Sequence, residues 1–592
     1  MSLLPKIPRY LITTADERTW KFDCPVIFLG EWCCLYDRKH VWQKMDAITA
    51  RPFGLDHGQK DNSIIYVQLL AKTLLSELTS VLNKFQGTQY SERYWEILLG
   101  HWLQRYVAIT FNRYFAIEQV LREYDVIGTT IIDSSADILA KKTSLEFWQS
   151  CMKDSWNLSL YSKVLAFIGT DKLNISLSNI GENDNSESRS DINSKERAIK
   201  KIIAASKKQL YRLSKNNDAF IVNTYLPLKE EIKLQVSLWQ FPQLWESPEI
   251  TGVNPDKKTR DTFHINSEHH KGYEKFVRLS LKDIIPVCFL EGYSALRRQT
   301  ELLVWPAKPK YIFTSNSFDT DEVFKAWTGS KVEKGIKYFV GQHGNNYGTH
   351  KYSGNRYWPD QTASDKFITW GWTNGNKHNI PAFIFKMAGQ KENNRNNNGG
   401  LLLIEVHIPM RDQPFDSDYE HKLYQDEQYR FVQSLPERIQ NHLSIRLHYA
   451  SKSLYWSESK RWHDFNAQLS VDEGGTPISK IIADSRLVVH SYDSTGILEN
   501  LSMNIPTICF WYNGLNHLIP KAKPYYEQLH NAGILAYTAE EAAKMVTVRW
   551  DNVDAWWKSD DVQQARKLFC DQYARIEKKP VQVLKKILEK YL

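Results

Sequence analysis

Residues 488–511, VVHSYDSTGILENLSMNIPTICFW, carry the clearest fold signal in the chain. An apolar run enters a hydroxyl-rich turn, helically spaced apolar residues follow, and a second apolar run ends the segment. The order strand, turn, helix, strand is typical of a parallel α/β sheet. Ser494, Thr495 and Gly496 fall where the helix is expected to begin, so backbone N–H groups, two hydroxyls and the positive helix end converge there. The segment therefore predicts an anion site, with phosphate as the first choice.

The same residues also suit an ordinary helix cap, because Ser and Thr are common N-cap residues. Glu499 follows Gly496 by three residues and could either cap the backbone or accept hydrogen bonds from sugar hydroxyls. This segment alone leaves both interpretations open.

Similar short apolar runs recur along the chain. After residue 305 they lie at 337–341, 365–369, 401–406, 443–447, 487–490 and 507–510, alternating with helical segments. Before it they lie at 10–13, 25–29, 124–133, 219–223 and 286–290, with sustained helical spacing at 63–121. We therefore predict an α/β protein with two Rossmann-like, doubly wound domains facing across a cleft and a helical insertion in the first. The predicted divisions are 1–304, 305–555 and a set of terminal helices at 556–592.

Length and composition limit the class of protein. A chain of 592 residues is too long for one core, because single domains rarely exceed roughly 250–300 residues. A net charge of +8 with no long basic run gives no reason to expect a nucleic-acid partner. Seven scattered cysteines without metal-ligand spacing predict reduced thiols in the cytosol, and no run reaches the roughly 18 apolar residues of a membrane span.

The motif QHGNNYG directly follows the predicted strand at 337–341. His343 should therefore project from a strand end into the cleft, while the glycines permit close backbone approach. A histidine there can take a proton from a hydroxyl or, when protonated, hold a leaving phosphate. Gln342 and Gly344 flank it and are assigned to the same donor site. A turn histidine bonded only to backbone is the alternative.

Arg446 and His448 alternate with apolar residues in SIRLHY, so both side chains should leave the same face of the sheet near a strand end. They could contact a nucleotide. A solvated strand end explains the pattern equally well.

Glu31 and Glu291 each follow an apolar run, in PVIFLGEWC and PVCFLEGY. Carboxylates buried at such positions have raised pKa values and can act as a base or a nucleophile, so both are candidate catalytic residues. Glu31 could instead simply pair with Arg38.

Several common site motifs are absent from the sequence. It contains no GxxxxGK[ST], GxGxxG after a strand, GxSxG or HExxH pattern, which argues against P-loop, dinucleotide, hydrolase and zincin chemistry. Asp319 and Asp321 have D-x-D spacing, but we do not expect Asp16, Asp319 and Asp321 to form the acidic metal cluster of metal-dependent transferases. We therefore expect no metal and no cofactor, with a helix dipole and basic side chains holding phosphate.

Together these motifs resemble a known family. The order QHG, RLHY and HSYDSTG is similar to the carboxyl-terminal domain of GT-B glycosyltransferases with CMP- or CDP-activated donors, including capsule ulosonic-acid transferases. The whole chain resembles a bacterial family of transferases from O-antigen and surface-polysaccharide loci. The motifs that carry this resemblance are LITTADERTW, FLGEWC, RYWEILLGHWL, IFTSNSFDTDEVFKAW, QHGNNYG, ITWGW and the 488–511 segment with its following AGIL.

The resemblance implies roles for individual residues. His343 would match the histidine of the HG motif, a catalytic or phosphate-contacting group, and His448 a second histidine near the donor nucleotide. Ser494 and Thr495 would match paired hydroxyls that hold the donor phosphate. RLHY replaces the His-Pro of many CMP-sugar enzymes, and no acid of the N-terminal half matches a nucleophile motif.

These observations lead to a metal-independent glycosyltransferase that moves an ulosonic acid, Kdo or a nonulosonic acid such as pseudaminic acid, from a CMP donor to an O-antigen or capsule acceptor. In that scheme residues 1–304 face a lipid-linked or oligosaccharide acceptor, and residues 305–555 bind the nucleotide sugar. The alternatives are a UDP- or GDP-hexose donor, a CDP-polyol donor, or a non-catalytic glycan-binding protein of the same fold. The expected location is cytoplasmic, and the tail VQVLKKILEKYL suits either peripheral contact with the inner membrane face or a packed terminal helix.

Overall fold

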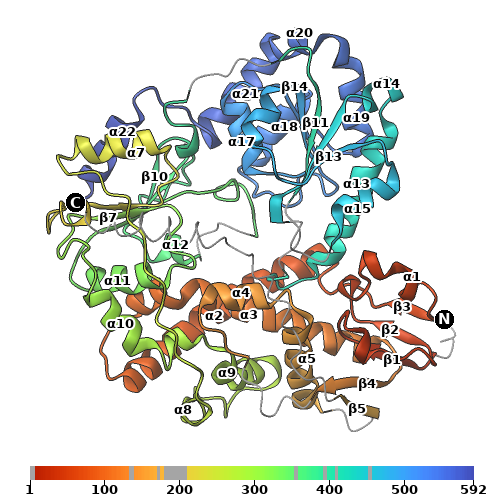
Figure 1. Ribbon diagram of the computed structural model, residues 1–592, viewed down its shortest axis with the longest axis vertical. Helices are drawn as coiled ribbons and strands as arrows, with labels where there is room; N and C mark the ends of the chain where they lie inside the picture. Colours follow the sequence, from red (N-terminus) through yellow and green to blue (C-terminus); the bar gives the residue numbers. More distant parts are fainter. Residues whose placement is uncertain are drawn as a thin grey trace, which may run out of the picture.

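Three all-parallel sheets flanked by helices form the molecule (Figure 1). The computed structural model describes residues 7–132, 139–169, 174–178, 210–352, 358–390, 396–406, 411–450 and 456–592. The predicted α/β class is confirmed. All seven cysteines, which lie within these ranges, are free thiols.

The N-terminal sheet has the strand order β3-β2-β1-β4-β5. Its strands are β1 (Arg9–Ile12), β2 (Val26–Phe28), β3 (Ala47–Thr49), β4 (Val126–Ile132) and β5 (Asn174–Ser178). The short helix α1 (Lys39–Trp42) precedes β3, and α4 (Ser144–Ser150) and α5 (Asp154–Ile168) lie between β4 and β5. The apolar runs at 10–13, 25–29 and 124–133 therefore correspond to strands, except that 133 lies outside the described residues.

Along the chain, two long helices follow β3 and precede β4 (Figure 1). Asp56 caps α2 (His57–Gln86), Ser91 caps α3 (Glu92–Glu123), and Gly87 ends α2 in the left-handed conformation, with φ of 63°. The predicted helical spacing over 63–121 is thus confirmed. Contrary to the expectation from the sequence, α2 is long and apolar enough to cross a membrane by length and composition, the one such helix in the described part of the chain. Core helices of soluble proteins meet the same criterion, and 44% of the most apolar window of α2 is buried inside the protein.

The middle sheet has the sequential order β10-β9-β8-β7-β6. Its strands are β6 (Phe220–Val222), β7 (Ile312–Thr314), β8 (Tyr338–Gly341), β9 (Lys366–Thr369) and β10 (Asn379–Pro381), and its helices are α7 (Leu228–Ser237), α8 (Lys257–Asp261), α9 (Gly272–Ile284), α10 (Tyr293–Glu301), α11 (Glu322–Val332) and α12 (Pro359–Thr362).

The predicted boundary at residues 304 and 305 cuts through this middle sheet, because β6 pairs directly with β7. The chain before 305 therefore supplies one whole sheet and part of a second. Residues 286–290 are also not a strand. They contain the 3-10 helix η4 (Val287–Phe289), since a short buried apolar run carries no period that separates strand from helix.

The C-terminal sheet has the order β13-β12-β11-β14-β15-β16. Its strands are β11 (Gly400–Ile404), β12 (Leu443–Arg446), β13 (Ser470–Asp472), β14 (Ser485–His490), β15 (Thr507–Phe510) and β16 (Leu535–Ala536), and its helices are α13 (Ser417–Ser434), α14 (Glu437–Gln440), α15 (Glu458–Phe465), α16 (Ile478–Ala483), α17 (Thr495–Ser502), α18 (Lys523–Asn531) and α19 (Ala539–Arg549). The order reverses between β11 and β14. Ligands of doubly wound sheets bind at such a switch point, outside the carboxyl ends of the strands.

The chain finally crosses back to the middle sheet. After α20 (Val553–Trp557) and α21 (Asp560–Tyr573), the backbone N–H of Arg575 donates to the carbonyl of Trp370 at 2.9 Å. The last helix, α22 (Pro580–Lys590), lies against α7 and buries Leu584 and Leu588 (Figure 1). The packed terminal helix was therefore the correct alternative for the tail.

Candidate active site between the middle and C-terminal sheets

The helix α17 begins where the sequence predicts. Ser494 is its N-cap, and its Oγ accepts from the backbone N–H of Ile497 at 3.3 Å. The backbone N–H groups of Thr495 and Gly496 have no hydrogen-bond partner within the described residues. Two N–H donors and the positive end of the helix dipole are thus available to an anion at the switch point.

Gly496 is explained by packing. A Cβ atom there would lie 2.6 Å from Cε1 of His490, the last residue of β14, so only glycine allows the helix to approach this strand end. His490 is fully buried, and burial lowers its pKa to about 3. The ring is therefore neutral at pH 7, and it packs against the first turn of α17 at Gly496.

The QHGNNYG turn of the middle sheet meets this helix N-terminus. The backbone N–H of Asn345 donates to Oγ1 of Thr495 at 3.2 Å, and a Cβ on Gly344 would lie 3.5 Å from the same oxygen. The buried face of α17, including Leu498 and Leu501, belongs to the core that contains the middle sheet rather than to the core of its own sheet. The two predicted motifs therefore form one site across the two sheets.

Asp493 connects the two sides of this site, and the sequence analysis missed it. Its Oδ1 accepts from Nδ2 of Asn345 at 2.6 Å and from the hydroxyl of Tyr526 at 3.1 Å. Its Oδ2 lies 3.0 Å from Nε2 of His350 and 3.0 Å from Nε2 of His517. Burial alone would raise the pKa of Asp493, but the hydrogen bonds from the two histidines hold it well below its ordinary value.

His343 lies at the carboxyl end of β8, as predicted, and its Nδ1 is 3.2 Å from the hydroxyl of Tyr347. Tyr347 in turn donates to the buried carboxylate of Asp360. Burial lowers the pKa of His343 to about 4, against a smaller opposing effect of Asp319. The ring is thus neutral at pH 7. When Asp360 is ionised, the single hydroxyl proton of Tyr347 goes to Asp360, so His343 donates from Nδ1 and keeps its lone pair on Nε2.

Asp360 therefore controls which nitrogen of His343 carries the proton. Burial raises its pKa from 3.8 to about 7, against the hydrogen bond from Tyr347, which lowers it. When Asp360 is protonated it donates to Tyr347, and Tyr347 then donates to Nδ1 of His343, so that the proton sits on Nε2. Ionisation of Asp360 reverses this chain and frees Nε2 as an acceptor.

This series of hydrogen bonds predicts how the turnover rate depends on pH. If Nε2 of His343 is the working base, the turnover rate falls as the pH drops through about 7, and Asp360→Asn removes this acid limb of the pH–rate profile.

The stability of the folded protein changes with pH in the opposite sense. Because the folded pKa is raised, the folded protein binds the proton more tightly, and Asp360 lowers stability as pH rises from about 4 to about 7. Turnover rates measured at several pH values test the first effect, and urea unfolding at the same pH values tests the second. An acid limb that is unchanged in Asp360→Asn contradicts the hydrogen-bond relay from Asp360 to His343.

Gln342 has a structural role. Its Oε1 accepts from the backbone N–H of Trp370 at 2.9 Å and from Nε1 of Trp372 at 2.8 Å, and its Nε2 donates to the carbonyl of Gly344 at 2.8 Å. The side chain is buried, and both of its polar atoms bond inside the protein. The side chain therefore holds the QHG turn in place, which argues against its predicted contact with a donor.

The remaining predicted donor residues lie at the same edge with partners of their own. Glu499 pairs with Nζ of Lys386 at 3.0 Å, which joins α17 to the middle sheet. Nη1 of Arg446 pairs with Asp472 at 2.6 Å, at the end of the neighbouring strand β13. The ring of His448 packs on the exposed ring of Tyr449, with centroids 4.4 Å apart.

Glu31 lies elsewhere. It follows β2 in the N-terminal sheet, and its carboxylate pairs with Nζ of Lys422 on α13 at 3.0 Å. Arg38 does not pair with it and instead bonds Glu17. Figure 1 shows the strands β1–β3 and the middle-sheet strands β7 and β10 on opposite sides of the molecule.

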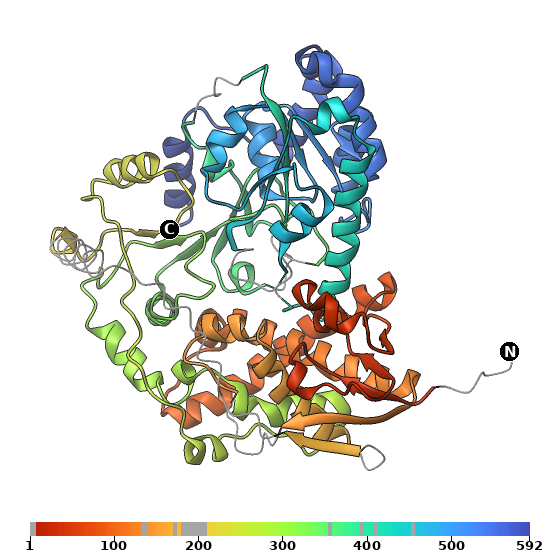
Figure 2. The same ribbon diagram turned by 45° about the vertical axis from the view of Figure 1, so that its right-hand side comes forward.

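Glu291 is part of a buried ion pair. Its two oxygens accept from Nε and Nη2 of Arg260 at 2.6 and 2.8 Å, and one also accepts from the backbone N–H of Asp256 at 2.9 Å. Arg260 lies in α8 and Glu291 just before α10, and both helices lie in the part of the molecule away from the C-terminal sheet (Figure 1 and Figure 2). This structural guanidinium occupies both carboxylate oxygens, an arrangement that argues against the catalytic role predicted for Glu291.

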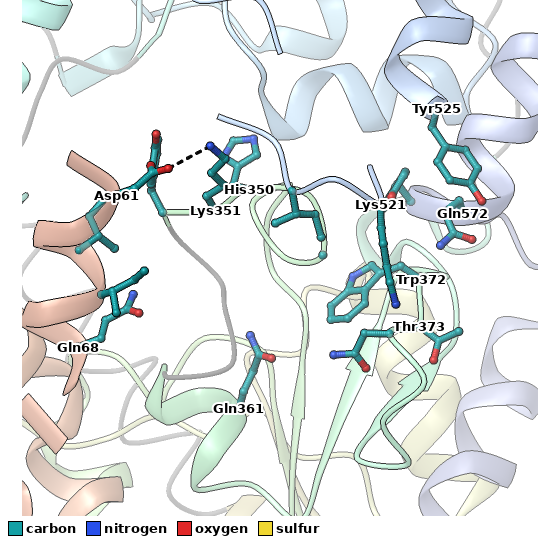
Figure 3. A pocket seen from close by; sticks show the side chains of 17 residues that line it. Asp61, Gln68, His350, Lys351, Gln361, Trp372, Thr373, Lys521, Tyr525 and Gln572 are labelled. Carbon is teal, nitrogen blue, oxygen red and sulfur yellow. Dashed lines mark hydrogen bonds and ion pairs between the residues drawn. The ribbon is translucent and has the colours of Figure 1, made fainter. Parts of the chain in front are cut away.

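A cavity of about 640 Å³ opens beside the site (Figure 3). Asp61 and Gln68 of α2 line one side, and Lys521, Tyr525 and Gln572 line the other. His350 also lines this cavity, so the Asp493 cluster borders it directly. Apolar and aromatic side chains complete the wall, among them Ile64, Ile65, Trp372, Ile519 and Tyr573.

The residues missed by sequence reasoning fall into two groups. Asp493, Asn345 and His350 lie inside or next to the quoted motifs, so their position was a usable signal. His517 and Asp360 lie in segments without a motif, and only the fold brings them to the site.

Two facing parallel sheets, a helix N-terminus at the switch point of one of them and a C-terminal segment that crosses back define the GT-B class of architecture. A model of the LIC12162 family of transferases matches residues 9–588. The chain belongs to this family and is a transferase.

Comparison with solved structures gives similarities at low levels. The wall teichoic acid polymerase TagF has 12% identity and a TM-score of 0.34, covering 67% of this chain and 95% of that one. Acinetobacter baumannii MurG has 10% identity and a TM-score of 0.32, covering 63% and 99%. Anabaena HepE in complex with UDP and glucose has 10% identity and a TM-score of 0.32, covering 53% and 88%. No curated protein matches at a significant level.

Proposed function

We propose that the protein is a glycosyltransferase that moves an ulosonic acid, Kdo or a nonulosonic acid, from a CMP donor to a surface-polysaccharide acceptor. The observation that supports this most is the contact between Asn345 and Thr495. It brings the histidine-bearing turn of one sheet to the helix N-terminus of the other, as a reaction between a phosphate donor and a hydroxyl acceptor requires. In this scheme the donor phosphate accepts from the free N–H groups of Thr495 and Gly496.

His343 acts as the base. A neutral imidazole with its lone pair on Nε2 suits proton removal from an acceptor hydroxyl better than it suits holding a phosphate anion. The hydroxyl oxygen then attacks the anomeric carbon, the bond from that carbon to the phosphate breaks, and CMP leaves with its charge at the positive end of α17.

The cavity in Figure 3 is the proposed acceptor path. Trp372 and Tyr525 offer aromatic faces to a sugar, the isoleucines suit a lipid carrier, and Lys351 and Lys521 suit its phosphate. A cytoplasmic location at the inner membrane face fits such an acceptor and the free cysteines. The apolar face of α22 is already used by α7, so any membrane contact would come from other surfaces.

A nucleotide panel tests the donor assignment. We expect CMP to raise the melting temperature of the full chain more than CDP, UDP or GDP, and incubation with CMP-sugars to release CMP, detected by mass spectrometry. Stabilisation by UDP, GDP or CDP instead would move the assignment to a hexose or polyol donor. Glycan binding without turnover of any donor would indicate a binding protein.

The phosphate contact has its own test. The hydroxyl of Thr495 accepts from the N–H of Asn345 and can itself donate to the donor phosphate beside the two N–H groups. We expect Thr495→Val, which removes only this hydroxyl, to weaken binding of the preferred nucleotide by roughly tenfold or more, because a hydrogen bond to a charged group contributes about 1.5–3 kcal/mol. Ser502→Ala is the matched control, since Ser502 lies at the other end of the same helix and bonds only the carbonyl of Glu499. Equal affinities for the two variants in calorimetry would remove Thr495 from the donor site.

A further inference from the structure

Three side chains with metal-binding atoms meet beside the candidate phosphate site. Nε2 of His350, Nε2 of His517 and a carboxylate oxygen of Asp493 lie within 4.8 Å of one another. His350 follows β8, Asp493 follows β14 and His517 follows β15, so the three come from loops at the carboxyl edges of two facing sheets. Because these loops belong to separate parts of the sequence, no local spacing could have predicted the group.

The backbone fixes the two histidine loops against each other. The N–H of Lys351 donates to the carbonyl of His517 at 2.9 Å, and the N–H of Ile519 donates to the carbonyl of Thr349 at 2.8 Å. The two rings meet edge to face, with centroids 4.8 Å apart. The cluster is therefore held by main-chain bonds and does not depend on long, mobile side chains.

The two nitrogen–oxygen distances fit a shared ion. Both histidine nitrogens lie 3.0 Å from the same oxygen, Oδ2 of Asp493. Bonds of about 2.0–2.2 Å to one metal ion place neighbouring ligand atoms roughly 3.0–3.5 Å apart. All three side chains are at most 15% exposed, while His350 borders the cavity and leaves an approach open.

The surroundings also resemble those of a metal ligand set. The other oxygen of Asp493 accepts hydrogen bonds from Asn345 and Tyr526, which fix the orientation of the carboxylate. Metal-ligating carboxylates are usually oriented by hydrogen bonds of this kind. His517 uses Nε2 for Asp493, and a hydrogen bond with the backbone of Gly514 also acts on this ring.

We propose that His350, Asp493 and His517 bind one divalent transition-metal ion, of the Zn²⁺, Co²⁺ or Mn²⁺ class. Two imidazole nitrogens and one carboxylate oxygen favour these ions over Mg²⁺ and Ca²⁺, which prefer all-oxygen ligands. The fourth position faces the cavity. Because Asn345 contacts both Asp493 and Thr495, the ion adds positive charge next to the donor phosphate. That last role rests on the proposed function, whereas ion binding does not.

Metal binding is measured on the full chain without nucleotide, after chelator treatment and dialysis. We expect one equivalent of Co²⁺ to bind and to give visible d–d absorption, and Zn²⁺ to displace it. His350→Ala and His517→Ala should lose this absorption, and Tyr526→Phe should weaken binding by about tenfold. His463→Ala is the matched control, because His463 is exposed on α15 and bonds only a backbone carbonyl.

The wild-type titration decides the proposal even if a variant fails to fold. Absence of stoichiometric Co²⁺ or Zn²⁺ binding by the wild type overturns it and leaves Asp493 as a hydrogen-bond acceptor for two imidazoles. Binding that survives both His350→Ala and His517→Ala overturns it as well. Metal binding without any nucleotide binding would keep the site and reject the proposed function.

Discussion

His343→Ala is expected to lower kcat by about 10²–10⁴-fold, because positioned general-base catalysis contributes a factor of that size. His343 lies at the end of β8, with Nδ1 oriented by Tyr347 and the opposite nitrogen left to act on a substrate. Turnover of the donor identified by the nucleotide panel, measured with a saturating acceptor, gives the effect directly.

Two comparisons separate catalysis from binding in this experiment. Nucleotide affinity of His343→Ala should remain near that of the wild type, since the N–H groups of Thr495 and Gly496 are unchanged. Tyr347→Phe should lower kcat less and alter the acid limb of the pH profile, because it only removes the group that sets the tautomer. Full turnover by His343→Ala would exclude this residue from the mechanism.

Glu291→Gln is expected to lower the free energy of unfolding by about 3–5 kcal/mol while leaving kcat of the folded protein unchanged. The reason is that the substitution leaves the buried guanidinium of Arg260 without its charged partner. Urea unfolding followed by tryptophan fluorescence reports the stability, and donor turnover at low temperature reports the activity.

Glu301→Gln is the matched control for this prediction. Glu301 forms a pair with Arg297 at 3.8 Å with both side chains well exposed, and such surface pairs contribute about 0–1 kcal/mol. A Glu291→Gln protein that stays as stable as this control but loses turnover would restore the catalytic role that the structure argues against.

Local elements were predictable because their causes are local. Ser494 caps α17 through an N–H three residues away, and Asp56 and Ser91 cap α2 and α3 in the same way. The QHG turn likewise follows from an apolar strand ending in glycine-containing polar sequence. Capping bonds and apolar periodicity act over a few residues, so the sequence carries them in full.

Partner choice was not predictable at the same level. Glu31 and Glu291 occupy similar positions after apolar runs, yet one bonds Lys422, which is 391 residues away, and the other bonds Arg260. Electrostatic and hydrogen-bond partners depend on distance in space, which the spacing along the chain does not encode.

The sequence by itself thus determined the α/β class, most strand positions and the capped N-terminal end of α17. Only the tertiary structure placed β6 beside β7 in a middle sheet, because strand pairing joins segments 90 residues apart as readily as neighbours. It alone brought His350 and His517 to Asp493, since each ring lies in a loop whose course is set by the packing of two sheets. Local capping determines where α17 begins, whereas the packing of the middle sheet against the C-terminal sheet determines which side chains surround that helix end.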